Sequence, residues 1–269
     1  MKKIFQILFD STWFAFVFFM IQFAFVLLGS AIWKDMMSNP TALSFNMFGS
    51  SVTTIILFWM MKLWKEKKGK ISKIPHLLYP LVGCLAFLSL APSVALNEAM
   101  GVEMNEQTER IIMSIIESPW GFVIVAVLVP LAEEIVFRGT LLRRLLIRFR
   151  NPWIPILISA IVFGCVHGNM AQFIHATLLG ILLGWLYYNT RSVLPGLALH
   201  FVNNFIAFIG VKLFPETQNQ SLIEIYEGNM TQLVSDITMC TILLVTAIYI
   251  IQTRLFSHSK SLEAYKEHL

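Results

Sequence analysis

Residues 13–33 read WFAFVFFMIQFAFVLLGSAIW, an apolar run without a single charged side chain. About 20 such residues span the hydrocarbon core of a bilayer as one α-helix. The rest of the chain has the same character, since 57% of its 269 residues are hydrophobic and only 13% are charged. Soluble domains carry about 25% charged residues. The composition therefore excludes a soluble enzyme, a disordered protein and a secreted disulfide scaffold, and it predicts an all-α polytopic membrane protein.

Seven further apolar runs follow the first, and we expect each of them to form a transmembrane helix. We interpret the first run as a retained helix and not as a cleaved signal peptide, because Asp10 interrupts the short apolar stretch before it and no small-residue cleavage site follows. The eight expected spans are Trp13–Trp33, Leu43–Met61, His76–Leu96, Trp120–Phe137, Trp153–Gly168, Met170–Tyr188, Val193–Phe214 and Ile237–Thr253.

The basic residues indicate how the chain is oriented. If the N-terminus is cytoplasmic, all of the 20 basic residues except Lys34, Arg110 and Lys212 fall in cytoplasmic segments. Because Lys and Arg are enriched on that side of membranes, this pattern predicts about eight helices with both termini in the cytoplasm. The net charge of +4 is therefore a topology signal and not a nucleic-acid surface. Two segments are expected outside, namely Asn97–Pro119, in which Ile111–Ile116 follows the membrane surface, and Pro215–Asp236.

Ionisable side chains are scarce inside the expected spans, and most of those present lie in the second half of the chain. An ionisable group within a bilayer is energetically costly, so each one is a functional candidate. A shared site requires the fourth helix to continue past Arg138, because the expected boundaries place Glu133 and His167 near opposite faces of the membrane. With the adjoining amides, the set comprises Glu133, Glu134, His167, His175, His200, Asn203 and Asn204.

Helix geometry distinguishes the two acids. Adjacent residues of a helix point about 100° apart, so Glu133 and Glu134 cannot face one site equally. Glu134 precedes Arg138 by four residues, which is the favourable order for an ion pair within one helix. Glu133 is then free to take a partner from another helix. The alternative interpretation is that both acids belong to one structural salt-bridge cluster.

Two other spacings place polar groups on one helix face. Phe163 and His167 are four residues apart, and so are His200 and Asn204. Each feature alone is explained by helix packing, but together three helices offer polar groups within runs that otherwise lack them. Glycines four residues apart allow neighbouring helices to approach closely, namely Gly164 with Gly168 and Gly180 with Gly184.

These residue types suit amide hydrolysis. A carboxylate beside an imidazole can bind a water molecule and accept its proton. A second His and an Asn amide can donate hydrogen bonds to the oxyanion that develops on a carbonyl group. The same donors could instead bind zinc through Glu133, His167 and His200. The chain has no HExxH stretch and no GxSxG elbow, which argues against zincin and serine-hydrolase chemistry.

Three short motifs carry a family resemblance. The stretch Glu133–Gly139, EEIVFRG, resembles the EExxxR motif of the CAAX-protease and bacteriocin-processing family, also called the Abi family. Phe163–His167 resembles the FxxxH motif of that family, and His200–Asn204 resembles its HxxxN motif. The motifs occur in the family's order, and the similarity covers about Trp120–Phe208.

The resemblance implies an eight-helix intramembrane endopeptidase related to the eukaryotic enzyme that removes the last three residues of prenylated CAAX proteins. Carried over by position, it makes Glu133 with His167 the pair that activates the water. His200 with Asn204 then forms the oxyanion hole. The family's glutamate-dependent mechanism needs no metal, so we expect no cofactor, with zinc as the alternative. Supporting roles fall to Glu134, Arg138, Phe163 and Asn203, the last being a second candidate amide beside Asn204.

The resemblance also divides the chain into three parts. Residues 1–119 hold about three helices and the acidic external loop, residues 120–208 form the catalytic core, and residues 209–269 hold the end of the seventh helix, the second loop, the eighth helix and the tail. Its bacterial members are implicated in bacteriocin maturation, self-immunity and peptide processing. We therefore expect a multi-pass protein of a bacterial plasma membrane. Its expected partners are the lipid bilayer and a membrane-associated peptide or protein substrate, with no nucleic acid.

Two other functional classes use the same residues. A non-catalytic membrane protein that confers immunity or acts as a scaffold would use the polar residues only for structure. A transporter would use them as a proton relay, although the sequence has no visible internal repeat of the kind that transporters show.

Overall fold

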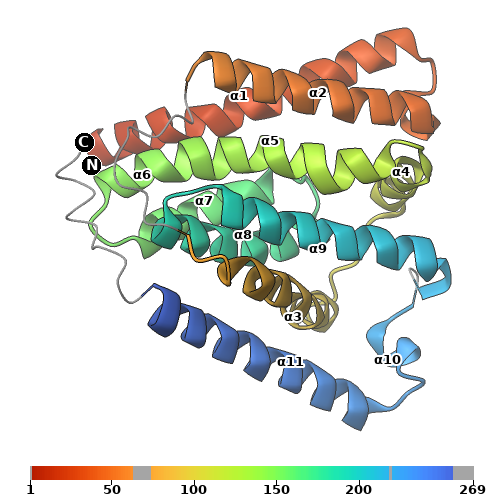
Figure 1. Cartoon of the computed structure of the whole chain (residues 1–269). Coiled ribbons are helices and arrows are strands. Elements are labelled where there is room, and N and C mark those ends of the chain that lie inside the picture. Colours follow the sequence, from red (N-terminus) through yellow and green to blue (C-terminus); the bar gives the residue numbers. More distant parts are fainter. Residues whose placement is uncertain (1, 63–73, 218–219, 257–269) are drawn as a thin grey trace.

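The computed structural model describes residues 2–62, 74–217 and 220–256, and every regular element in these ranges is a helix (Figure 1). The all-α prediction is thus confirmed. The basic segments 63–73 and 257–269, which contribute to the expected cytoplasmic charge, lie outside the described residues. The main helices are α1 (Lys2–Ile32), α2 (Pro40–Met60), α3 (Leu78–Ala99), α4 (Glu106–Glu117), α5 (Val129–Val136), α6 (Arg143–Arg148), α7 (Trp153–Cys165), α8 (Met170–Thr190), α9 (Leu194–Leu213), α10 (Leu222–Ile225) and α11 (Met230–Ile250).

Short helical turns join or extend these helices. Two are 3-10 turns, η1 (Met36–Ser38) and η4 (Pro215–Thr217). Three are wider π-helical turns, namely η2 (Val123–Leu128), η3 (Phe137–Leu142) and η5 (Ile251–Leu255).

Six of the described helices are long and apolar enough to cross a membrane. This confirms the prediction of a multi-pass membrane protein, while the full number of eight spans stays a prediction. Helix α7 is also apolar, but its 13 residues extend only about 20 Å, less than the ~30 Å of a hydrocarbon core. The six are α1 from Thr12, α2, α3, α8, α9 and α11 together with η5.

The fourth expected span forms one continuous helical stretch made of η2, α5, η3 and α6. It extends to Arg148 and so passes Arg138, as a shared site requires. Pro130 lies in the first turn of α5, directly after the wide turn η2, where its missing N–H removes one backbone hydrogen bond. Arg138, which the charge pattern placed in a cytoplasmic segment, is instead fully buried in the bundle.

The expected external segments contain more helix than the sequence indicated. The stretch Ile111–Ile116 belongs to α4, whose Ile115 and Ile116 are buried. Helix α11 begins at Met230, so the last expected span starts about two turns earlier than Ile237. In Figure 1, α4 and α10 lie at one end of the bundle, whereas the first turns of α1 and the last turns of α11 lie at the other.

Three of the four glycines that were expected to allow close helix packing lie where α7 and α8 meet. A Cβ at Gly164 would collide with Phe173 and Thr177 of α8, and a Cβ at Gly180 would lie 3.0 Å from Ala160 of α7. Gly184 faces Ile156 in the same way. The fourth, Gly168, contacts nothing at its Cβ position and has φ +72°, so it forms the left-handed turn between the two helices.

Candidate active site

The Glu134–Arg138 ion pair predicted from their spacing is present in the structure. Arg138 Nη1 donates to Glu134 Oε1 at 2.9 Å, and both side chains are almost completely inaccessible to solvent. Arg138 Nη2 also donates to the Gly180 carbonyl of α8 at 3.4 Å. The guanidinium carbon lies 4.3 Å from the centre of the Phe163 ring, a cation–π contact. Arg138 therefore joins α5, α7 and α8.

His200 of α9 lies between the two carboxylates. Its Nδ1 is 3.2 Å from Glu134 Oε1, and its Nε2 is 3.6 Å from Glu133 Oε2. Glu133 thus takes a partner from another helix, as its spacing predicted. Only the contact with Glu134 is within hydrogen-bond distance, while the longer one brings Glu133 beside the same ring. We call Glu133, Glu134, Arg138 and His200 the Glu–His cluster.

Phe163 contacts both His200 and the second histidine of the motifs. Its ring meets the imidazoles of His167 and His200 edge-on, with centroid distances of 5.1 and 5.8 Å. His167 lies just beyond the end of α7, in the turn before Gly168, and no direct contact joins it to Glu133 among the described residues. Its Nδ1 lies 2.9 Å from the Phe163 carbonyl oxygen. Because a carbonyl only accepts, Nδ1 carries the hydrogen, and Nε2 of the neutral ring is an acceptor.

The two neighbouring amides have different environments. Asn203 is buried and donates from Nδ2 to Asn204 Oδ1 at 3.1 Å. Asn204 donates from its own Nδ2 to the Val125 carbonyl of η2 at 2.9 Å. The amide with the family spacing is therefore the one that reaches the wide turn ahead of the two glutamates.

The structure adds two residues to this region that the motifs do not include. His175 of α8 is hydrogen-bonded to Ser93 of α3 at 2.7 Å and lies near His167 and His200. The sequence placed His175 inside a span but gave it no role. Ser93 carried no signal at all, because a serine inside a membrane helix commonly bonds its own backbone.

The described residues do not form a zinc site of the expected composition. No group of three or more His, Cys, Asp or Glu side chains is placed so that it could hold a metal ion in the part of the chain that the structure describes. Glu133 and His200 adjoin one another, but His167 forms no ion pair with Glu133 among the described residues and packs against Phe163. The ligand set Glu133, His167 and His200 therefore does not fit a common ion in this arrangement.

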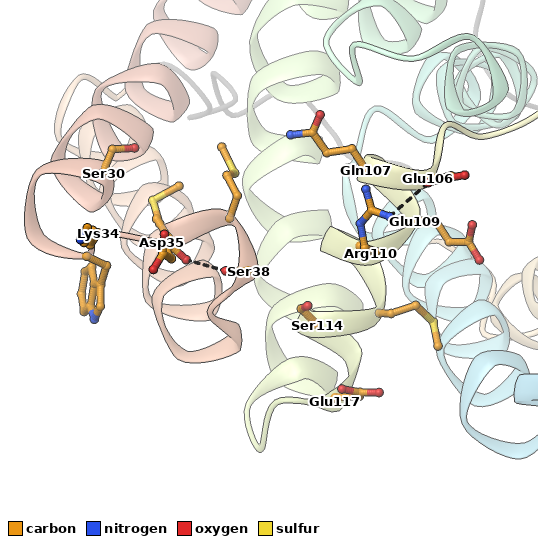
Figure 2. A pocket seen from close by; sticks show the side chains of 14 residues that line it. Ser30, Lys34, Asp35, Ser38, Glu106, Gln107, Glu109, Arg110, Ser114 and Glu117 are labelled. Carbon is orange, nitrogen blue, oxygen red and sulfur yellow. Dashed lines mark hydrogen bonds and ion pairs between the residues drawn. The ribbon is translucent and has the colours of Figure 1, made fainter.

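Two hollows lie outside the Glu–His cluster. The larger one, about 1020 Å³, lies between the end of α1 with η1 and one side of α4 (Figure 2). In Figure 2, Lys34 and Asp35 face Glu106 and Arg110 across it, and none of its lining residues belongs to the cluster. The smaller hollow, about 320 Å³, is almost entirely apolar. Apart from Tyr79 of α3, its lining residues lie within nine residues of Glu133 or His200 in the sequence, namely Ala126, Val127, Leu131, Leu194, Leu197, Ala198 and Phe201.

Fold and site together define a helical multi-pass membrane protein with a buried cluster of carboxylates and imidazoles. Residues 115–206 match the model of the type II CAAX prenyl endopeptidase Rce1-like family, so this part of the chain is similar to that family. The match contains all three motifs, covers about a third of the chain and confirms the family resemblance. The family is one of proteases. No curated protein and no solved structure matches the chain significantly.

Proposed function

We propose that the protein is an intramembrane endopeptidase that hydrolyses a peptide bond of a membrane-associated peptide or protein. The observation that carries this proposal is the Glu–His cluster, in which Glu133 has no ion-pair partner on its own helix and lies 3.6 Å from His200. A buried carboxylate that is not neutralised by an adjacent arginine can accept a proton during catalysis. The family match supports the same conclusion independently.

In the proposed reaction, Glu133 and His167 Nε2 hold the hydrolytic water. Glu133 accepts one proton of this water while the water oxygen forms a bond to the carbonyl carbon of the substrate, whose π electrons move to the carbonyl oxygen. When the resulting tetrahedral oxyanion collapses, the C–N bond breaks. The departing nitrogen then takes the proton back from Glu133, so the carboxylate is regenerated and no covalent enzyme intermediate forms.

The oxyanion is stabilised in this proposal by His200 and by the Asn204 amide. Removal of one such donor commonly lowers kcat by about 10²- to 10³-fold. Asn204 Nδ2 donates to the Val125 carbonyl in the structure, so a bound substrate takes over that hydrogen bond. Glu134, Arg138 and Phe163 hold His200 in place, and Asn203 holds Asn204.

The Glu–His cluster does not require a metal in this mechanism. Zinc held by Glu133, His167 and His200 is the competing use of the same donors, and it would need these side chains to rearrange around the ion. Such an ion would supply Lewis-acid activation of the water.

In this proposal the substrate reaches the Glu–His cluster from within the membrane. The apolar hollow between α3, α5 and α9 offers about 320 Å³ for a hydrophobic segment of the substrate, and Leu194 and Val127 on its lining are exposed at the outer surface of the bundle. A membrane-associated peptide of a bacterium, such as a bacteriocin precursor or a self-immunity target, fits this description. The host membrane is then a bacterial plasma membrane.

We further propose eight spans with both termini cytoplasmic, and residues 120–208 as the catalytic core between an N-terminal part (1–119) and a C-terminal part (209–269). Helix α7 and the stretch from η2 to α6 complete the six long helices to eight. The first turns of α1 and the last turns of α11 share one end of the bundle, as an even number of spans requires (Figure 1). Cysteines introduced at Arg150 and Gly228 should be labelled from opposite sides of the membrane.

The proposal is tested by comparing membrane and secreted peptides from a deletion strain that carries the wild-type protein, Glu133→Gln or the matched control Glu103→Gln. Glu103 is an exposed acid of the external segment. We expect peptides whose length changes with the wild type and the control but not with Glu133→Gln, at equal protein levels. Identical peptide sets in all strains would refute the protease assignment.

The non-catalytic alternative makes a different prediction. If the cluster only holds helices together, alanine at His167 or His200 lowers protein stability but leaves the phenotype intact once expression is matched. A protease loses its phenotype in both variants even when their levels equal that of the wild type.

A further inference from the structure

A polar contact outside the three motifs joins α3 to α8. Ser93 is 3% exposed, and its hydroxyl lies 2.7 Å from His175 Nδ1. One turn later in α3 and one turn earlier in α8, Asn97 Nδ2 donates to the Ala171 carbonyl at 3.1 Å. Both contacts connect positions four residues apart on each helix, so they fix the register of α3 against α8. None of the three motifs contains any of these residues.

Helix α8 packs against α9, and Asn203 of α9 lies near His175 of α8, although no hydrogen bond joins the two side chains in the structure. Asn203 is 4% exposed, and its Oδ1 is buried without a hydrogen-bond partner among the described residues. Its Nδ2 donates to Asn204, which donates to Val125. A row of polar groups therefore leads from α3 through α8 and α9 to the Asn204 amide.

The direction of each hydrogen bond in this row follows from donor and acceptor chemistry. An unpartnered Oδ1 of Asn203 needs a donor, and the neighbouring side chain that can supply one is the His175 ring through Nε2–H. A neutral ring with hydrogen on Nε2 has an acceptor at Nδ1, which then receives the Ser93 hydroxyl hydrogen. With Oδ1 of Asn203 turned to His175, its NH₂ group is turned to Asn204 Oδ1. Asn204 must then present its own NH₂ group outward.

We propose that Ser93 and His175 are positioning residues that hold the Asn203 amide in one orientation and, through it, aim the Asn204 NH₂ group at the oxyanion. This inference rests on the proposed peptidase function. It explains why a buried histidine and serine lie beside the motifs although neither belongs to them. It also gives the N-terminal part of the chain, through α3, a role in catalysis.

Kinetics of purified variants on a cleaved peptide test this role. Loss of one neutral hydrogen bond is worth about 1 kcal/mol, so His175→Leu and Ser93→Ala should each lower kcat about tenfold with little change in KM. Ser93→Thr keeps the hydroxyl and should restore kcat. The matched control is Ser89→Ala, one turn away on α3, whose hydroxyl bonds the Ala86 carbonyl of its own helix; it should leave kcat unchanged.

A double-mutant cycle distinguishes positioning from a merely structural contribution. Because His175 acts through Asn204, His175→Leu should cause no further loss of kcat in an Asn204→Ala background. Losses that multiply in the double variant would overturn the proposal, as would a change in KM alone. Equal thermal midpoints of the variants show that the losses do not arise from unfolding.

A spectroscopic measurement tests the row independently of activity. In the wild-type protein labelled with ¹⁵N-histidine, Nδ1 of His175 should be unprotonated, and Ser93→Ala should shift its resonance. A protonated Nδ1 would overturn the proposal even if the enzyme is active. If Glu133-dependent cleavage is absent, the proposed function fails, while this resonance still decides whether Ser93 orients His175.

Discussion

Burial should determine how much an ion pair contributes to the stability of this protein. Two glutamate–arginine pairs with identical spacing allow this contribution to be compared. Glu134–Arg138 and Glu106–Arg110 are both i,i+4 pairs, with N–O distances of 2.9 and 3.2 Å. The side chains of the first pair are 0% and 1% exposed, and those of the second are 88% and 70% exposed. The proposed perturbation replaces the arginine of each pair by methionine, giving the variants Arg138→Met and Arg110→Met.

The expected losses differ widely. Arg138→Met leaves the Glu134 carboxylate buried without its cation, which typically costs about 3–5 kcal/mol. His200 Nδ1 remains 3.2 Å from the same oxygen and partly compensates, so we expect about 3 kcal/mol. This corresponds to roughly 10²-fold in the folding equilibrium. Arg110→Met removes a solvated pair worth less than about 0.5 kcal/mol.

Unfolding by sodium dodecyl sulfate in mixed micelles, followed by tryptophan fluorescence, measures both losses in the full-length protein. The double variant Glu134→Gln/Arg138→Met removes both charges and should recover most of the loss, because no buried charge then lacks its partner. If Arg138→Met destabilises the protein no more than Arg110→Met, the inferred burial of this pair is incorrect.

Three further predictions follow from other parts of the structure. Gly180→Val should lower the unfolding free energy by about 1–3 kcal/mol, because a Cβ at this position would press on Ala160. A Cβ at Gly210 meets nothing within 4 Å, so the control Gly210→Val should lower it less. Equal losses would disprove the close helix contact. Chelators should leave Glu133-dependent cleavage by the purified enzyme unchanged, and a loss that added zinc restores would favour the metal alternative. Hydrogen bonds from the backbone N–H and hydroxyl of Ser221 hold the pKa of the Glu224 carboxyl below its usual 4.5. The stabilisation of this capping box is therefore present above about pH 4.5 and is lost as the pH falls through the lowered pKa. Protection of the Ser221 amide, measured against its intrinsic exchange rate at each pH, should therefore fall only in acid, and Glu224→Gln should abolish that dependence.

The sequence alone predicted correctly those features that depend on the geometry of a single helix. The spacing of Glu134 and Arg138 predicted their ion pair, and apolar run lengths predicted the long helices, because both depend on local geometry alone. The boundaries of α7 and α11 were less accurate. Helix α7 ends at Cys165, three residues before the expected boundary at Gly168, and Met230 extends α11 into a polar segment.

Contacts between helices could not be predicted in the same way. The spacing left Glu133 without a partner but could not show that His200 takes both glutamates, since that depends on how α5 and α9 are rotated against each other. Ser93 illustrates the limit most clearly. Nothing distinguishes it from Ser89 in the sequence, yet one hydroxyl reaches another helix and the other bonds its own.

The position of His200 between two carboxylates has a consequence for how the protein responds to membrane voltage. The two carboxylates, Arg138 and His200 lie together in one buried cluster, so a proton exchanged within it travels only a short distance across the membrane. In the proposed mechanism Glu133 takes a proton from water and returns it to the product, so no charge crosses the bilayer. A charge that moved through the full potential would contribute about 2.3 kcal/mol per 100 mV. Cleavage in sealed vesicles should therefore proceed at the same rate with and without an imposed potential, unlike transport by a proton relay.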